Sequence, residues 1–183
     1  YAFRLHHAYR PRSYLCQYQE SGLTFVSRLL EREGIYYWFD DDGRIEFVDD
    51  RILQPDDALA LRYAPAQHVV DAGATAEHVV TALRARFRRP PAAIVVHHHN
   101  HRKAIVDLTV REPVSADGCG EVRCDENYRD VNEGRRYARL RAEQMRAEAQ
   151  RFEGETSAIG VRSGRTIALD GHFSPEWNQR YWV

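Results

Sequence analysis

The sequence predicts an α+β fold that is rich in β-strands, and three observations lead to this prediction. Short stretches in which apolar and polar residues alternate recur along the chain, as in strands with one buried face. Two segments carry apolar residues at helical spacing. Because these helical segments do not alternate regularly with the strands, a Rossmann-like parallel sheet is not expected, and an antiparallel α+β or barrel architecture fits better.

Composition and charge argue against several classes of protein. The 183 residues include 26 Lys plus Arg and 27 Asp plus Glu, so the formal net charge is −1. This balance argues against a generally basic nucleic-acid binder. Apolar residues make up 43% and charged residues 29%, as in a globular chain. No apolar run approaches the roughly 18 residues of a membrane span, so neither a nucleic-acid partner nor a stable membrane anchor is expected.

The strongest local signal is a helix between residues 21 and 34, preceded by an aromatic strand at 14–18. The Ser21 hydroxyl is expected to cap this helix by accepting a free N–H of the first turn. Gly34 is expected to end it in a left-handed conformation. One apolar stripe is formed by Leu23, Val26, Leu29 and Leu30.

A β-hairpin is expected directly after this helix. Residues 35–39 are aromatic and β-prone, and residues 44–48 alternate cleanly. The turn Asp40-Asp41-Asp42-Gly43 tolerates the positive φ angles of tight hairpins, and loops of two, three or four residues all fit. One face of the hairpin is expected to pack under the helix. Tyr36 and Trp38 are candidates for the core or for an interface.

The rest of the chain predicts further strands and one long helix. Strands are expected at residues 59–63, 79–88, 93–97 and 105–110, and at 166–169 and 180–183. The helix is expected over residues 133–152, ended by Gly154. Its apolar stripe consists of Tyr137, Leu140, Met145, Ala149 and Phe152.

The most unusual local feature is the run His97-His98-His99-Asn100-His101. Neutral imidazoles are good ligands for zinc, copper or nickel. In a strand, alternate residues share a face, so His97, His99 and His101 would reach one ion only with some bending. The alternative is a solvated strand end or turn that is rich in histidine.

Other chemistry-bearing residues give weak signals. The serines lack a G-x-S-x-G context, and Cys16 is expected as a small core residue of a strand. Asp40–42 and Asp49–50 lack the spacing of a calcium-binding loop and are expected in turns. Cys119 and Cys124 form a local disulfide or stay reduced. A solvated face or a protein interface is expected for Arg84, Arg86, Arg88, Arg89, Arg102 and Lys103.

Three motifs recur in the order of one known family. The first is Tyr14-Leu15-Cys16-Gln17-Tyr18-Gln19-Glu20-Ser21 with the helix and aromatic strand that follow it to Phe39. The second is Gly134 with residues 137–143 and 152–155. The third is Asp170-Gly171-His172-Phe173 followed by Asn178 and residues 180–183. Together they resemble the VgrG spike proteins of type VI secretion and the related late-control and baseplate hub proteins of contractile phage tails.

The resemblance implies a gp27-like hub region, in which antiparallel strands form split β-barrel subdomains with two supporting helices. It divides the chain into a strand–helix–hairpin part at residues 1–75 and a second β-barrel part at 76–183 with the helix 133–152. The N-terminal strands and the spike of the family are expected outside this chain, which we interpret as a piece of a longer protein. Residues 98–101 replace the family's usual Asp-Tyr-Asn/Asp-aromatic element, so local packing or partner contact is expected to differ.

The function that the resemblance implies is structural and not enzymatic. The full-length protein is expected to form a homotrimer that caps the hexameric Hcp-type tube and carries the membrane-puncturing spike with a tip protein or effector. It would assemble in the bacterial cytoplasm and then be secreted by the type VI apparatus without a signal peptide. No catalytic residue, cofactor or metal site is expected. A contractile-phage or prophage baseplate hub is the alternative, and a metal-dependent hydrolase using His97–His101 is the second alternative.

Overall fold

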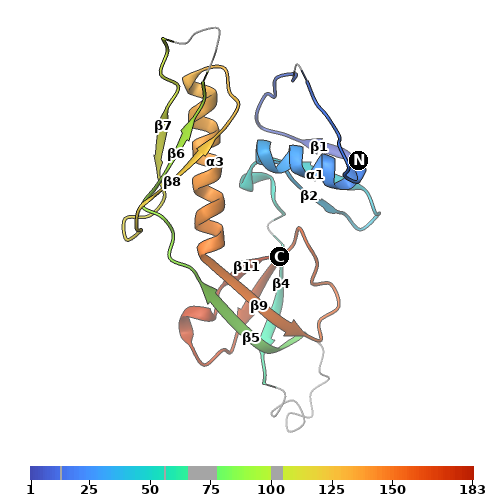
Figure 1. Ribbon diagram of the computed structural model, residues 1–183. Coiled ribbons are helices and arrows are strands. Elements are labelled where there is room, and N and C mark those ends of the chain that lie inside the picture. The colour runs from blue at the N-terminus through green and yellow to red at the C-terminus, as the bar shows by residue number, and fades with distance from the viewer. Residues whose placement is uncertain (13, 56, 66–77, 100–104) are drawn as a thin grey trace. The chain divides into compact units, whose positions relative to one another are not determined.

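The computed structural model describes residues 1–12, 14–55, 57–65, 78–99 and 105–183 (Figure 1). Within these ranges the chain consists mostly of strands with two helices, so the predicted β-rich α+β class is confirmed. The strands form three sheets with no closed barrel in the described ranges, and each sheet contains parallel as well as antiparallel pairs. The expected antiparallel pairs are present in every sheet, and parallel pairs accompany them because several neighbouring strands are separated by a crossover and not by a hairpin.

Contacts divide the chain into two compact units, unit 1 with residues 1–84 and 154–183 and unit 2 with residues 85–153. The predicted boundary at residues 75–76 lies outside the described residues. Unit 1 holds β1 (Ala2–Arg4), α1 (Gly22–Glu33), β2 (Tyr36–Phe39), β3 (Ile45–Val48), β4 (Ala58–Tyr63), β10 (Thr166–Asp170) and β11 (Arg180–Trp182). Unit 2 holds β6 (Ala93–His97), β7 (Val110–Pro113), β8 (Glu121–Asp125) and α3 (Val131–Ala149). The division passes through two strands, β5 (Val79–Phe87) and β9 (Gln150–Thr156), each of which has residues in both units.

The helix–hairpin module of unit 1 consists of α1 and the sheet β1-β3-β2. Both predicted caps are confirmed: Ser21 accepts the Thr24 N–H at 3.1 Å, and Gly34 has a φ of 74°. The hairpin has a three-residue loop, because Asp40 and Arg44 still pair through their backbones and Gly43 adopts a φ of 74°. Residues 14–18 are not a strand among the described residues, since they pair with no neighbouring strand.

The second part of unit 1 is the five-stranded sheet β11-β10-β4-β5-β9. It contains the strands predicted at residues 59–63, 79–88, 166–169 and 180–183. Its core lies around Leu61, Val80 and Leu169. The strand β9 was not expected. The long helix ends at Ala149, before the predicted Gly154, because the chain passes directly into β9 and pairs there with β5.

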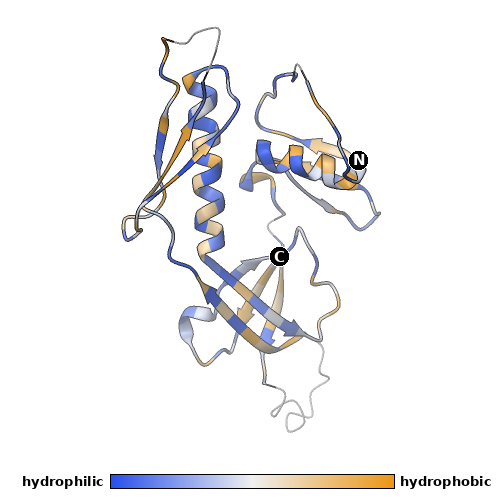
Figure 2. Ribbon diagram, viewed as in Figure 1, coloured by the Kyte–Doolittle hydropathy of each residue, from blue (hydrophilic) through white to orange (hydrophobic). Residues whose placement is uncertain are grey.

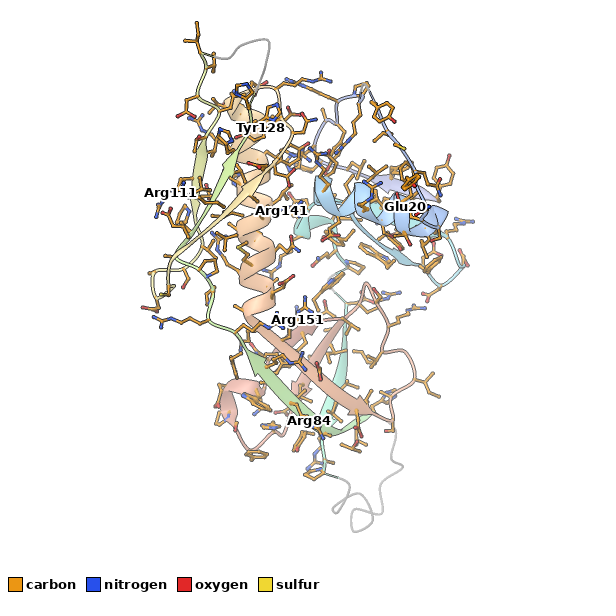
Figure 3. All side chains as sticks on the ribbon, viewed as in Figure 1. Glu20, Arg84, Arg111, Tyr128, Arg141 and Arg151 are labelled. Atoms are coloured by element: carbon orange, nitrogen blue, oxygen red, sulfur yellow. The ribbon has the colours of Figure 1, made fainter. Side chains whose placement is uncertain are left out.

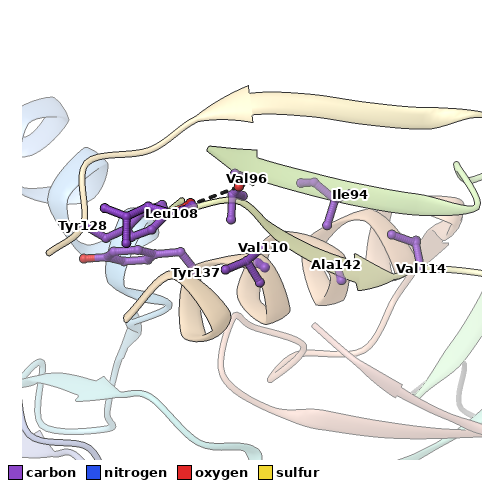
Figure 4. Packing of buried hydrophobic residues seen from close by; sticks show 9 residues of the cluster. Ile94, Val96, Leu108, Val110, Val114, Tyr128, Tyr137 and Ala142 are labelled. Carbon is purple, nitrogen blue, oxygen red and sulfur yellow. Dashed lines mark hydrogen bonds between the residues drawn. The ribbon is translucent and has the colours of Figure 1, made fainter. Parts of the chain in front are cut away.

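The second unit packs α3 against the sheet β7-β6-β8 (Figure 1). The predicted strand at 93–97 is confirmed, whereas β8 was missed and residues 105–109 precede β7 without being part of a strand. Figure 4 shows the core between helix and sheet, and its buried members are Ile94, Val96, Leu108, Val110, Val114, Tyr128, Tyr137, Ala138 and Ala142. The predicted stripe is partly confirmed, since Tyr137 is buried and Leu140 and Met145 pack against this cluster. The other buried residues of α3, Gly134, Ala138 and Ala142, were not part of that stripe.

Candidate functional site

The third sequence motif forms an aromatic cluster around a buried histidine. His172 is 5% exposed and stacks on Phe173 and Trp177, with ring centroids 4.2 and 4.6 Å apart. Its Nδ1 accepts the Ser174 N–H at 3.0 Å. Asn178 closes the loop, because its side chain accepts the His172 N–H at 2.7 Å and donates to the His172 carbonyl at 3.0 Å. This motif therefore builds the turn between β10 and β11.

The second motif has a comparable structural role in unit 2, where Tyr128 is 1% exposed beside α3 (Figure 3). A Cβ atom at Gly134 would lie 2.6 Å from the Tyr128 ring, so the ring needs a glycine at that position. The Tyr128 hydroxyl donates to the carbonyls of Val96, at 3.2 Å, and Leu108 (Figure 4). Burial raises the pKa of this phenol. Sequence reasoning identified Gly134 but missed Tyr128, for which no periodic pattern gave a signal.

The first motif displays exposed apolar side chains. The helix α1 has no buried residue, and Leu23 and Val26 of its predicted apolar stripe are 66% and 42% exposed. Figure 2 shows hydrophobic residues along the first part of this helix. The adjoining segment is exposed as well, with Tyr14 and Tyr18 at 79% and 74%. We call these four residues, together with Leu15, the exposed N-terminal surface.

The segment before α1 is held to the helix by polar contacts. The Arg28 guanidinium pairs with the Glu20 carboxylate at 2.7 Å and donates to the Cys16 carbonyl at 3.3 Å. The hydrogen bond that Arg28 donates to the Glu20 carboxylate raises the pKa of the Arg28 guanidinium. Cys16 is exposed, so the expectation of a core cysteine was wrong. The apolar side chains of the exposed N-terminal surface are thus displayed on an ordered backbone.

Asp49 fastens the beginning of the chain to the module. Its carboxylate accepts the backbone N–H groups of His6 and His7 at 2.7 and 2.9 Å and the Tyr9 hydroxyl at 2.8 Å. Partial burial of this carboxyl favours its neutral form, but the three hydrogen bonds outweigh burial and hold the Asp49 pKa below its ordinary value. The neighbouring Asp50 caps a 3₁₀ turn, and Asp40 closes the hairpin, as expected of turn residues.

The histidine run is only partly within the described residues. His97 ends β6 with Nδ1 at 3.6 Å from an oxygen of Asp125. The His98 ring meets the Tyr128 ring at a centroid distance of 5.5 Å, with the two planes tilted by 48°. Asn100 and His101 lie outside the described residues. In the part of the chain that the structure describes, no three His, Cys, Asp or Glu side chains are placed to hold one metal ion. His97 and His98 thus contact different neighbours, Asp125 and Tyr128, and only His97 belongs to β6.

The remaining candidates are dispersed. Cys119 and Cys124 are both free, so the disulfide alternative is not formed, and burial raises the pKa of the Cys124 thiol. Arg86 makes an exposed ion pair with Glu153 at 3.5 Å. Arg89 donates to a backbone carbonyl at 3.1 Å, and Arg102 and Lys103 lie outside the described residues. No helix among the described residues is both long and apolar enough to cross a membrane.

Comparison with known proteins extends these observations over the whole chain. The chain is 30% identical over 195 residues to the type VI secretion system spike protein VgrG1b of Pseudomonas aeruginosa, and 26% identical over 185 residues to VgrG1a of the same organism. These alignments cover 98% and 96% of this chain but 25% and 28% of the relatives. The chain therefore spans about a quarter of the length of the curated relatives it matches.

One solved structure is similar in fold, and one family model matches the sequence. The fold is similar to the 43 kDa tail protein of prophage MuSo2 from Shewanella oneidensis, with a TM-score of 0.64 at 9% identity over 99% of this chain and 55% of that chain. The profile of the phage tail baseplate hub (GPD) family matches residues 1–183. The match of the family model over the whole chain shows that the chain belongs to the phage tail baseplate hub (GPD) family.

Proposed function

We propose that this chain is the hub region of a VgrG-like spike of a type VI secretion system. In this proposal the full-length protein trimerises, caps the hexameric Hcp-type tube, and carries the spike with its tip protein or effector into a target cell. It assembles in the cytoplasm and leaves through the type VI apparatus. The observation that carries the proposal is the similarity to VgrG1b and VgrG1a along nearly the whole chain.

The exposed N-terminal surface supports a role in assembly. Isolated exposed apolar residues are ordinary, but several on one helix and its adjoining segment are typical of a surface that is covered by a partner. The chain has a formal net charge of −1, so copies do not repel one another strongly through their total charge. A cyclic trimer uses each such contact three times, which suits a surface of modest size.

The proposal assigns no catalytic residue, cofactor or metal to this chain. Several polar groups with backbone partners serve the fold: His172 and Asn178 build a turn, Tyr128 bonds to backbone carbonyls, and Asp49 holds the beginning of the chain. Each is explained by a backbone partner, which is what a scaffold requires. The second alternative, a hydrolase using the histidine run, has no observation in its favour.

The test measures assembly of the full-length protein that contains this chain. We expect a trimer by light scattering, co-sedimentation with rings of the tube protein, and appearance of the protein in culture medium only when the secretion apparatus is intact. The variant Leu23→Glu should lower the trimer fraction. The matched control is Ile159→Glu, because Ile159 is 93% exposed in the same unit but lies outside the exposed N-terminal surface. A stable monomer at micromolar concentration contradicts the proposal.

A contractile-phage or prophage tail hub is the second candidate, and the likeness to the MuSo2 tail protein favours it. Both candidates require the same trimeric scaffold, so their mechanics do not separate them. The neighbouring genes do: secretion-sheath and ATPase genes support the spike, whereas capsid and tail-fibre genes support the phage hub. Release of the protein in particles that contain DNA would likewise support the phage hub.

A further inference from the structure

Within unit 1, the helix–hairpin module and the five-stranded sheet meet at an aromatic contact. Trp38 of β2 is 5% exposed and meets Trp182 of β11 edge to face, with ring centroids 5.8 Å apart. Tyr36 of β2 meets the same Trp182 ring at 6.5 Å. These three residues together with Gly164 are called the seam. Trp38 is therefore buried against another part of its own chain, which favours the core role over the interface role for this residue.

Gly164 gives the seam its geometry. It lies between the end of β9 and the start of β10, is buried, and has a φ of +83°. A Cβ atom at this position would lie 2.6 Å from Cδ2 of Trp38 and would overlap its Cβ and Cγ. The backbone of Gly164 is also fixed, because its N–H donates to the Val183 carbonyl at 3.0 Å. Only glycine satisfies both the backbone angle and the close approach of the indole.

Ion pairs surround the seam on the same two parts of unit 1. Arg165, directly after Gly164, places its guanidinium 3.1 Å from the Asp41 carboxylate in the hairpin turn and 2.6 Å from that of Asp57. Arg162 pairs with Asp41 as well. Two arginines of the loop before β10 thus bind the turn of the hairpin, while Gly164 leaves room for the Trp38 indole. The contacts restrict both ends of the hairpin relative to the sheet.

We propose that Gly164 is a positioning residue, which fixes the helix–hairpin module on the five-stranded sheet in the one orientation that hub assembly uses. The part of this inference that concerns assembly rests on the proposed function, whereas the seam itself is defined by contacts within the chain. Because the exposed N-terminal surface belongs to the helix–hairpin module, its direction relative to the sheet depends on the seam. A displaced Trp38 indole would therefore turn that surface away from its partner.

The chain contains a matched pair of glycines for testing this proposal. Gly43 has a φ of +74°, close to that of Gly164, but nothing lies within 4 Å of a Cβ atom added there. Gly43→Ala therefore introduces the backbone strain of a left-handed alanine without a clash. Gly164→Ala introduces the same strain and displaces Trp38. The difference between the two variants isolates the seam.

Hydrogen exchange of the full-length protein provides the first measurement. The Val183 N–H, which donates to the Arg165 carbonyl at 3.0 Å, reports on the seam. We expect Gly164→Ala to accelerate its exchange at least tenfold and Gly43→Ala to leave it within about threefold, with amides of β6 unchanged in both. In a Trp38→Ala background, Gly164→Ala should no longer accelerate this exchange beyond the Gly43→Ala level. Equal exchange in the two glycine variants overturns the proposal.

Trimer content by light scattering provides the second measurement. We expect Gly164→Ala to reduce the trimer fraction at least fivefold at a concentration where Gly43→Ala remains trimeric. A seam that opens while the trimer persists overturns the positioning role and leaves the proposed function intact. A wild-type protein that is monomeric overturns the proposed function, and the positioning role falls with it, whatever the exchange data show.

Should Gly164→Ala fail to fold, Trp182→Ala tests the same seam without backbone strain. Trp182 is 40% exposed, and its truncation removes the edge-to-face contacts with Trp38 and Tyr36 while leaving the backbone of Gly164 unchanged. Ile159→Ala is the control, because Ile159 is 93% exposed in unit 1 and lies outside both the seam and the aromatic cluster around His172. Loss of trimer in Trp182→Ala with retention in Ile159→Ala supports the proposal, and retention in both overturns it.

Discussion

Two helices of this chain each pack on a three-stranded sheet, yet they differ in how much they bury. In both modules the central strand, β3 or β6, pairs parallel with one neighbour and antiparallel with the other. The helix α3 buries four residues against its sheet, whereas α1 buries none. The same local architecture thus produces a closed core in unit 2 and an exposed apolar surface in the helix–hairpin module.

Residue size explains much of this difference. Gly134, Ala138 and Ala142 recur every four residues along α3, so small side chains lie on one face and the helix approaches its sheet closely. Tyr128 then fills the space that Gly134 leaves open. The corresponding residues of α1 are large, and Leu23 remains mostly exposed. An apolar stripe therefore predicts a helix, but a stripe of small residues is the better predictor of close packing within the chain.

The largest expected effect is on the core of unit 2. Tyr128→Ala should lower the free energy of unfolding by about 3–5 kcal/mol, because it removes a buried ring together with the hydrogen bond of its hydroxyl. Tyr14→Ala, at a tyrosine that is 79% exposed, should change it by no more than about 0.5 kcal/mol. Urea denaturation followed by circular dichroism measures both. Similar losses for the two variants would contradict the contrast between the modules.

An overpacking variant tests the small-residue stripe directly. Ala138 is fully buried, so Ala138→Leu should destabilise the protein by about 1–3 kcal/mol by pushing α3 away from β6. The matched change on α1 is Leu23→Ala, which should cost less than about 0.5 kcal/mol in the monomer. Thermal unfolding at low protein concentration separates this result from any effect of self-association. An unchanged stability in Ala138→Leu would show that α3 does not pack closely against β6.

The two helix caps should respond alike, since capping is local and independent of packing. Ser21 accepts one backbone N–H of α1, and Asp130 accepts those of Asn132 and Glu133 at 3.0 Å in α3. Ser21→Ala and Asp130→Ala should each cost about 1 kcal/mol. Hydrogen exchange in the first turn of each helix gives the two values separately. A much larger loss at one cap would mean that its helix depends on that end for tertiary structure.

The smallest expected effect concerns pH and the helix–hairpin module. The Asp49 pKa is lowered, so this carboxylate stabilises the folded module above its ordinary pKa of 3.8, and the contribution disappears as the pH falls through the lowered value. Asp49→Asn should remove this part of the acid dependence. Exchange of the His6 and His7 amides between pH 5 and pH 3 is the measurement. Identical pH profiles for the wild type and the variant would exclude Asp49 as the fastening group.

The sequence by itself determined the features that depend on neighbouring residues. Ser21, Gly34 and Gly43 specified two helix ends and a hairpin turn, because capping and positive φ angles are local properties. Alternation specified most of the strands, and the motifs indicated the family. The end of α3 was misplaced, since β9 competes for residues 150–156 by pairing with a strand more than sixty residues earlier.

Only the tertiary structure decided which strands are neighbours and which residues are buried. Parallel pairs such as β4 with β10 join segments that no local pattern connects. Tyr128 and Gly164 carry no periodic signal, and their roles follow from contacts with Gly134 and Trp38. Burial is a property of the partners that surround a side chain, so the apolar stripe of α1 predicted a helix and could not predict what covers it.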